Sequence, residues 1–268
     1  MDISYKDTEK ALKRHESEIK ALYQKAYSVI RKDMAETMAK MQLSGNFQER
    51  IDLASKYDRL NAMSERCSKA IQDAGKRAVK IINDSMGGVY AENYNFVANK
   101  FSIPPLSKRI SEKIVKSEIN PFTKIAEIKL KNIDNIISKF ETELLSGFAN
   151  GESIQKITRR IKNVLEINTK DAQRIARTEV IRTENQAKFD VGEEGKRLGF
   201  TIWKRWVATN DSRVRDDHAK MDGVEVPQDE PFIMPNGDRL MFPGDVSLGA
   251  SPENTIQCRC TIIEFIKQ

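Results

Sequence analysis

The segment FTIWKRWV (200–207) marks the point at which the chain changes from helical to β-structure. It combines aromatic and β-branched residues, which is typical of a strand. Before it, apolar residues recur at steps of three, four and seven, as on one face of an α-helix. After it, turn-forming sequences rich in Gly, Pro, Asn and Asp follow one another closely. The sequence therefore predicts an α+β fold, in which a long N-terminal helical region is followed by a C-terminal domain of helices packed on a small, mostly antiparallel sheet.

Helical periodicity extends over most of the chain before residue 200. Apolar stripes lie on both sides of LSGN (43–46), whose Gly and Asn indicate a turn. Cys67 falls on the second stripe, so we expect it to be buried as a small apolar residue. The predicted helical segments are 5–86, interrupted by that turn, then 107–117, 122–148, 153–165, and 169–198 with Thr169 as its cap.

Two glycine-containing segments divide this helical region. GGVYAENYNFVANKFSIPP (87–105) has paired glycines and paired prolines, and it predicts a short hairpin or an ordered loop. GFANGES (147–153) indicates the main boundary, which separates an N-terminal helical region (1–150) from a C-terminal domain (151–268). Within that domain, further strands are expected near 224–226, 232–234, 240–242 and 258–266.

The charge of the chain is unevenly distributed. Its 268 residues carry a net charge of +6. Residues 1–150 contain 26 Lys and Arg against 20 Asp and Glu, whereas residues 151–268 contain 19 of each. A basic excess suits a polyanionic partner such as double-stranded DNA. A solvated helical surface with slightly more Lys than Glu is the alternative interpretation.

Hydropathy and cysteine content limit the cellular context. No apolar run approaches the roughly 20 residues that span a bilayer, so we expect no membrane association. The first residues lack the apolar core of a secretory signal. Three cysteines are too few for a disulfide framework, which favours a reducing compartment.

Short motifs follow one another in the last hundred positions. IARTEVIRTENQA (175–187) places an Arg-Thr-Glu sequence on a helix, FPGD occupies 242–245, and CRC occupies 258–260. The residues that we single out as a structural constellation are Arg177, Glu179, Trp206, Asp211, Arg213, Arg215, His218 and Gly223.

In this order, the motifs resemble the phage head morphogenesis domain, the family of phage Mu protein F-like minor head proteins. The resemblance covers roughly residues 170–264, and it depends on the order of the motifs because no single one is specific. One departure is Gln257, where Asn is common in that family, and it bears on whether this residue can form a turn.

The resemblance implies a minor head component of a tailed phage or prophage that acts in procapsid assembly or DNA handling. It implies the portal protein, the major capsid protein and double-stranded DNA as candidate partners. It also implies a location in the virion, inside the phage head, and in the host cytoplasm during assembly. No catalytic residue is carried over.

Cys258 and Cys260 form a candidate metal site with His218. Residues two apart on a strand share a face, with their Cα atoms about 6.7 Å apart. His218 is the only other imidazole or thiol after residue 150. Zinc binds such ligands and needs about four of them. The candidates for the fourth are Asp211, Asp216, Asp217 or a water. Two alternatives remain open, namely packed thiols with His218 hydrogen-bonded to a carboxylate, and a strained disulfide.

The charged residues of the constellation also allow two interpretations. Arg177, Glu179 and the two loop arginines can form an internal ion network that joins the helix to the sheet. Alternatively, paired arginines can bind phosphate or nucleotide.

An enzyme is the alternative class of function. His218 with Cys258 or Cys260 is formally able to serve a hydrolase or a nucleotide-active transferase. The sequence lacks the phosphate-binding loop, the His-Glu-x2-His zinc-protease motif and the Gly-x-Ser-x-Gly nucleophile motif. We therefore expect a structural protein rather than an enzyme.

Overall fold

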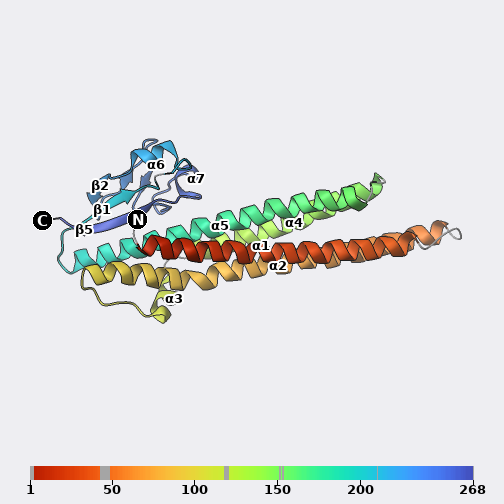
Figure 1. Cartoon of the computed structure of the whole chain (residues 1–268), viewed down its shortest axis with the longest axis horizontal. Helices are drawn as coiled ribbons and strands as arrows, with labels where there is room; N and C mark the ends of the chain where they lie inside the picture. Colours follow the sequence, from red (N-terminus) through yellow and green to blue (C-terminus); the bar gives the residue numbers. More distant parts are fainter. Residues whose placement is uncertain are drawn as a thin grey trace. The chain divides into compact units, whose positions relative to one another are not determined.

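The computed structural model describes residues 3–42, 49–117, 121–150, 152, 154–209 and 211–267 (Figure 1). The long helices are α1 (Ile3–Gln42), α2 (Glu49–Lys100), α4 (Pro121–Ala149) and α5 (Ile154–Arg197), and α3 (Lys108–Ser117) is short. The C-terminal elements are β1 (Ile202–Val207), α6 (Asp216–Lys220), β2 (Glu225–Pro227), β3 (Phe232–Ile233), β4 (Arg239–Leu240), α7 (Pro252–Thr255) and β5 (Thr261–Ile266). These elements confirm the α+β class. Across the described ranges, no helix has an apolar stretch long enough to cross a membrane.

The chain forms two compact units, each assembled from segments that are distant in sequence. We call Met1–His15, Ile82–Phe122 and Arg174–Gln268 the sheet unit, and Glu16–Ile81 and Thr123–Gln173 the helical unit. The boundary between the helical unit and the sheet unit after Gln173 lies within α5. The domain boundary near residue 150 stays a prediction.

The helical unit has a core of aliphatic and aromatic side chains at helical spacing. Its buried residues include Ile19, Tyr23, Ile30 and Met34 on α1, Met63, Cys67 and Ile71 on α2, Ile133, Phe140 and Leu144 on α4, and Ile157 and Ile161 on α5. Cys67 is fully buried, as its place on the apolar stripe predicts. A Cβ at Gly75 would lie 2.5 Å from Cδ1 of Ile133, so this glycine allows α2 and α4 to pack closely. The predicted turn at LSGN (43–46) lies outside the described residues.

The helix α2 continues through Gly87 and Gly88 to Lys100, so the predicted hairpin or loop in this segment is wrong up to that residue. The cost of two glycines in a helix is about 2 kcal/mol. A buried face compensates for this cost, and it includes Met86, Val89, Tyr90, Asn93 and Val97. Gly87 also admits α3, because a Cβ there would lie 2.5 Å from Cγ of Glu112. Tertiary packing thus overrides the local signal.

The two helices expected at 153–165 and 169–198 are a single helix, α5. Thr169 does not cap a new helix, since its Oγ1 donates a hydrogen bond to the carbonyl oxygen of Leu165 at 2.8 Å. A threonine hydroxyl can bond to the carbonyl four residues earlier without ending the helix. No Gly or Pro lies between residues 154 and 191 to interrupt it.

The C-terminal sheet has three antiparallel strands in the order β2-β1-β5, and β3 and β4 form a separate hairpin. β1 is central, and its Trp206 lies opposite Ile262 of β5. Alternation along β1 buries Ile202, Lys204 and Trp206. The predicted strand at 258–266 starts at Thr261, so the two neighbouring cysteines lie in an extended segment just before it. They still belong to the apolar core beneath the sheet.

Candidate functional site

One face of the second half of α5 carries polar side chains that are buried. Thr178, Arg182, Asn185 and Lys188 follow one another at steps of four, three and three, which places them on a single helix face. Their exposed fractions are 7%, 7%, 0% and 1%. Buried polar groups need hydrogen-bond partners. Residues 243–262 of the same unit provide partners for each of them.

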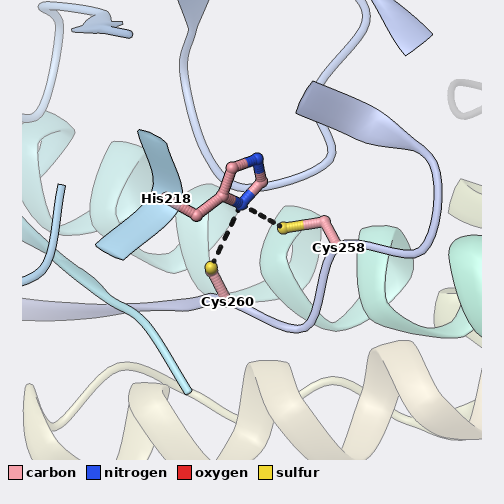
Figure 2. A group of neighbouring side chains, drawn as sticks. All are labelled: His218, Cys258 and Cys260. Carbon is pink, nitrogen blue, oxygen red and sulfur yellow. Dashed lines mark hydrogen bonds between the residues drawn. The ribbon is translucent and has the colours of Figure 1, made fainter. Parts of the chain in front are cut away.

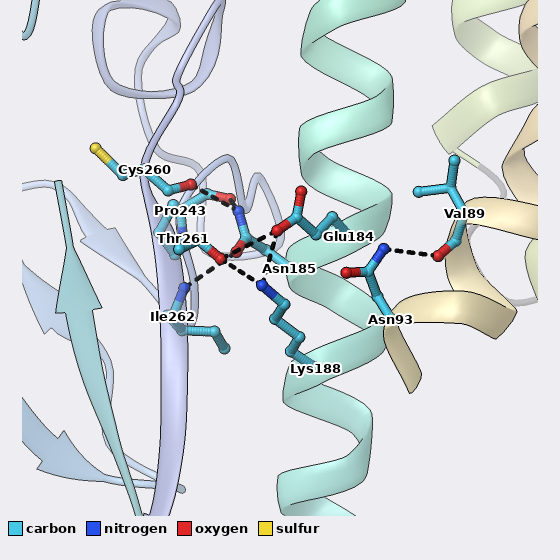
Figure 3. Close-up of polar contacts among 9 residues, drawn as sticks. All are labelled: Val89, Asn93, Glu184, Asn185, Lys188, Pro243, Cys260, Thr261 and Ile262. Atoms are coloured by element: carbon cyan, nitrogen blue, oxygen red, sulfur yellow. Dashed lines mark hydrogen bonds and ion pairs between the residues drawn. The ribbon is translucent and has the colours of Figure 1, made fainter. Parts of the chain in front are cut away.

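Asn185 binds the backbone along the outer edge of β5 (Figure 3). Its Nδ2 donates to the carbonyl oxygens of Pro243 and Cys260, both at 3.0 Å, and its Oδ1 accepts from the amide of Ile262 at 3.2 Å. β5 is an edge strand, so the amide of Ile262 and the carbonyl of Cys260, just before the strand, face away from β1. The side-chain amide of Asn185 therefore acts in place of a further strand.

Lys188 and Glu184 form a buried ion pair beside this edge (Figure 3). Nζ of Lys188 lies 2.7 Å from Oε1 of Glu184 and 2.8 Å from Oγ1 of Thr261, the first residue of β5. The hydroxyl of Thr261 also lies 3.3 Å from Oε1 of Glu184. Such a pair contributes little net stability, but losing one member leaves an uncompensated buried charge. It therefore fixes how β5 is placed on α5.

The FPGD motif supplies a second contact with α5. Phe242 lies in the core beneath the sheet. Gly244 has a φ of +87°, and its carbonyl oxygen accepts a hydrogen bond from Nε of Arg182 at 2.8 Å. The carboxylate of Asp245 accepts hydrogen bonds from the amides of Met241 and Ser247 at 2.8 and 2.7 Å. The motif is thus a turn that packs against the helix, and it carries no exposed reactive group.

The CRC motif is oriented by the residue before it. Gln257 follows α7 and has a φ of +54°, in the left-handed region where glycine and asparagine are favoured. Its amide donates to Oγ1 of Thr178 at 3.0 Å. Thr178 belongs to the Arg-Thr-Glu sequence of α5, so two of the motifs meet here. Gln257 does form a turn, although Asn is common at this position in the family that the sequence resembles.

His218 and the two C-terminal cysteines form a buried cluster (Figure 2). His218 lies on α6, and each of the three side chains belongs to a residue that is 2% exposed. Nδ1 of His218 lies 3.4 Å from Sγ of Cys260 and 3.5 Å from Sγ of Cys258. The potential ligand atoms of the three residues lie within 4.8 Å of one another. The ring of Trp206 packs edge-on against the imidazole, with centroids 5.8 Å apart.

The two thiols have opposite tendencies to ionise. A hydrogen bond from Cys258 is the largest cause that lowers the pKa of Cys260 well below its ordinary value, and His218 acts in the same direction. The same hydrogen bond and burial raise the pKa of Cys258. The pair therefore favours one thiolate, on Cys260, next to the imidazole. All three cysteines are free.

The predicted loop residues hold the segments around this cluster. Asp211 accepts two hydrogen bonds from the guanidinium of Arg259, at 2.5 and 2.6 Å, and one from the amide of Arg213 at 3.0 Å. These bonds, those of Arg259 first, hold the pKa of Asp211 well below its usual range. Arg215 donates to the carbonyl oxygen of Ile256 at 2.5 Å. Asp211 and Arg215 thus connect the segment before α6 to Arg259 and Ile256.

The helix residues of the constellation have different surroundings. Glu179 is buried, and its carboxylate lies 3.4 Å from Nη1 of Arg182. Arg177 is partly buried on α5. The helix is joined to the C-terminal turns through Arg182 and Gly244, so Arg182 contributes to the connection that we predicted for Arg177 and Glu179. An ion network that joins Arg177 and Glu179 to the two loop arginines, Arg213 and Arg215, stays a prediction.

Gly223 has a backbone role beside Trp206. Its φ is +79°, and its amide donates to the carbonyl oxygen of Trp206 at 2.9 Å. No heavy atom lies within 4 Å of a Cβ built there. The glycine is therefore required by its backbone conformation and not by lack of space. It returns the chain to β1 after α6, which carries His218.

Sequence reasoning missed three buried polar residues, Asn185, Lys188 and Lys204. Lys204 is fully buried, donates to the carbonyl oxygen of Gln228 at 2.9 Å and lies 4.7 Å from the ring centroid of Phe189. Burial lowers its pKa to about 8. The alternation in FTIWKRWV already places Lys204 on the face of Trp206, and helical spacing from Thr178 leads to Asn185. Both signals were present, but neither identifies a partner.

Comparison with known proteins agrees with this arrangement. A family model described as phage Mu protein F like protein matches residues 138–263, which include all of α5 and all the C-terminal motifs. Over these residues the chain is similar to the phage Mu protein F-like family. The resemblance of the motifs to that family is confirmed.

Three curated relatives extend the comparison. Minor head protein GP7 of Bacillus phage SPP1 is 24% identical over 221 residues, which is 79% of this chain and 70% of GP7. NAD(+)--arginine ADP-ribosyltransferase EFV of Enterococcus faecalis is 31% identical over 174 residues, 65% of this chain but 32% of that protein. YqbB of Bacillus subtilis is 27% identical over 140 residues, 52% of this chain and 44% of YqbB. The chain thus spans about one third of EFV and less than half of YqbB. No solved structure matches.

Proposed function

We propose that this chain is a minor head protein of a tailed phage or prophage that acts in head morphogenesis. The observation that carries the proposal is the match to GP7, which extends over 79% of this chain and therefore well beyond the C-terminal motifs. The protein is incorporated into the virion, inside the head, and is present in the host cytoplasm during assembly.

The burial of the candidate site supports a structural role over catalysis. A catalytic imidazole or thiol must reach its substrate, but His218, Cys258 and Cys260 are each 2% exposed. Thr178, Arg182 and Asn185 of α5 are likewise occupied by backbone partners. The transferase name of EFV belongs to a protein of which this chain covers 32%, and it gives no reason to assign that reaction here.

The partners that we propose are the portal protein and the major capsid protein. The long helices of the helical unit bury their apolar stripe and expose charged faces, and these exposed faces are the surface that we propose for the contact. Double-stranded DNA is a second candidate partner, and the basic excess of residues 1–150 favours it.

The role in head assembly is tested by deleting the gene from the phage that encodes it. We expect infectious titre to fall and wild-type protein supplied in trans to restore it, with the chain detected by mass spectrometry in purified virions. Normal titre and normal heads without the gene would overturn the proposal. The same complementation with Cys258→Ala and His218→Ala, checked for soluble folded protein, addresses the enzymatic alternative.

Partner choice is tested separately with purified proteins. We expect the full chain to bind isolated portal or capsid protein of the same phage. If the chain contacts DNA, we expect its affinity for DNA to fall as the salt concentration rises. We also expect that affinity to fall when the exposed residues Lys20, Lys25 and Lys69 are changed to Gln. An affinity for DNA that is unaffected by those changes would remove the helical unit as the DNA-binding surface.

A further inference from the structure

One nitrogen of His218 faces two sulfur atoms at once (Figure 2). Nδ1 lies 3.5 Å from Sγ of Cys258 and 3.4 Å from Sγ of Cys260. A ring nitrogen carries at most one proton, so a single hydrogen bond does not account for two nearly equal contacts. Zinc–sulfur and zinc–nitrogen bonds at tetrahedral angles place nitrogen and sulfur about 3.6 Å apart. Both contacts therefore match the spacing of ligands around one zinc ion.

The donor set also suits zinc chemically. Two thiolates and one imidazole are ligands that zinc prefers, and the three atoms come from rigid surroundings. Trp206 packs against the imidazole, and the turn at Gln257 is held by Thr178. Both sulfur atoms bind zinc as thiolates, and the ion itself supplies the positive charge that a second buried thiolate requires. Arg259 lies between them in sequence, but its guanidinium binds Asp211 instead.

Two of the three acidic candidates for a fourth ligand bind other residues. Asp211 binds Arg259, and Asp217 lies 3.0 Å from Nζ of Lys220. Within the described part of the chain, the group of potential ligands consists of His218, Cys258 and Cys260. A water molecule is therefore the expected fourth ligand. Nε2 of His218 is buried without a hydrogen-bond partner among the described residues, and ligation at Nδ1 leaves the proton on this atom.

We propose that His218, Cys258 and Cys260 bind a structural zinc ion in the sheet unit. The ion links α6 to the segment before β5, which lies 40 residues later in sequence. Short strands and many turns leave this region little regular structure, so a bound ion contributes directly to its folding. The low exposure of all three ligands favours this structural role. This inference does not depend on the proposed role in the phage head.

Metal analysis of the purified full chain tests the site. We expect about one zinc ion per chain in the wild type and at least tenfold less in Cys260→Ser. Cys67→Ala is the matched control, because Cys67 is also a fully buried free cysteine but lies in the helical unit. This control is expected to retain its zinc. Equal zinc in the wild type and in folded Cys260→Ser would overturn the assignment.

A second measurement covers the case in which Cys260→Ser fails to fold. Wild-type protein is treated with a chelator and titrated with cobalt(II), which gives a thiolate charge-transfer absorption band when cysteines bind it. We expect a band that saturates at about one equivalent, together with a thermal midpoint that rises as metal is added. No band, no zinc in the untreated protein and no effect of the chelator on the midpoint would together refute the site.

Discussion

The helical unit and the sheet unit are stabilised by different kinds of contact. Among the described residues, the buried side chains of the helical unit are mainly aliphatic and aromatic groups at helical spacing. In the sheet unit, buried polar side chains of α5 bind individual backbone atoms of the FPGD turn, the CRC segment and β5. Apolar packing tolerates changes that conserve volume, whereas buried polar contacts fail when one partner is removed. Substitutions should therefore affect the two units unequally.

The largest difference is expected for Lys188→Met in the sheet unit. It leaves the carboxylate of Glu184 buried without its cation, which should lower the free energy of unfolding by about 3–5 kcal/mol. Phe140→Leu in the helical unit should cost only about 1 kcal/mol, because it keeps most of the apolar volume. Urea unfolding followed by tryptophan fluorescence measures the first effect, since both tryptophans lie on β1. Circular dichroism follows the helices.

The double variant Glu184→Leu, Lys188→Met is the control for this prediction. It removes both charges and should recover most of the lost stability, as replacing a whole buried ion pair usually does. A loss below about 1 kcal/mol in the single variant would contradict a buried pair at this site.

Asn185→Ala is expected to have the next largest effect. It leaves two carbonyl oxygens and the amide of Ile262 without their partner, at a cost of about 2–3 kcal/mol. Asn93→Ala is a matched control, because Asn93 is also buried but donates to Val89 of its own helix (Figure 3). That substitution should cost about 1 kcal/mol or less. Hydrogen exchange adds a local measurement, since the Ile262 amide should lose protection only in Asn185→Ala, and similar effects of both variants would contradict the strand-like role of Asn185.

A pH-dependent effect is expected from Glu264 on β5. Burial raises its pKa to about 7, although Lys188, Lys100 and Lys204 oppose this shift. Between the unfolded pKa of about 4.5 and this value, the folded state binds the proton that the unfolded state has lost. Stability due to this group is therefore fully present below pH 4.5 and is lost as pH rises to 7, by an amount on the order of 3 kcal/mol. Glu264→Gln should remove this slope in unfolding curves at pH 5 and 7.5, and an unchanged slope would assign it to another group.

The comparison of the units also shows how much of the structure the sequence predicts. Helical periodicity was sufficient for the core of the helical unit, including Cys67, because period and burial are directly related. It failed at Gly87 and Gly88, where packing against α3 and burial of the following turns outweigh the local cost. In the sheet unit, the motifs indicated that His218 and the two C-terminal cysteines lie together, and the structure places them in contact. They did not predict the contacts of Asn185 or Lys188, because a buried polar residue on a helix does not reveal which distant backbone atom it binds.

The smallest expected effect is a gain in stability at Gln257. Its φ of +54° is unfavourable for most side chains and favourable for Asn and Gly. Gln257→Asn should therefore raise the free energy of unfolding by about 0.5 kcal/mol, and Gln257→Gly by a similar amount. Gln24→Gly, at an exposed position within α1, should have the opposite sign and cost about 1 kcal/mol. Thermal unfolding of the three variants measures the difference. If Gln257→Gly destabilises the chain as Gln24→Gly does, the side chain of Gln257 contributes a contact that outweighs its backbone strain, and the CRC turn is then not fixed by backbone conformation and Thr178 alone.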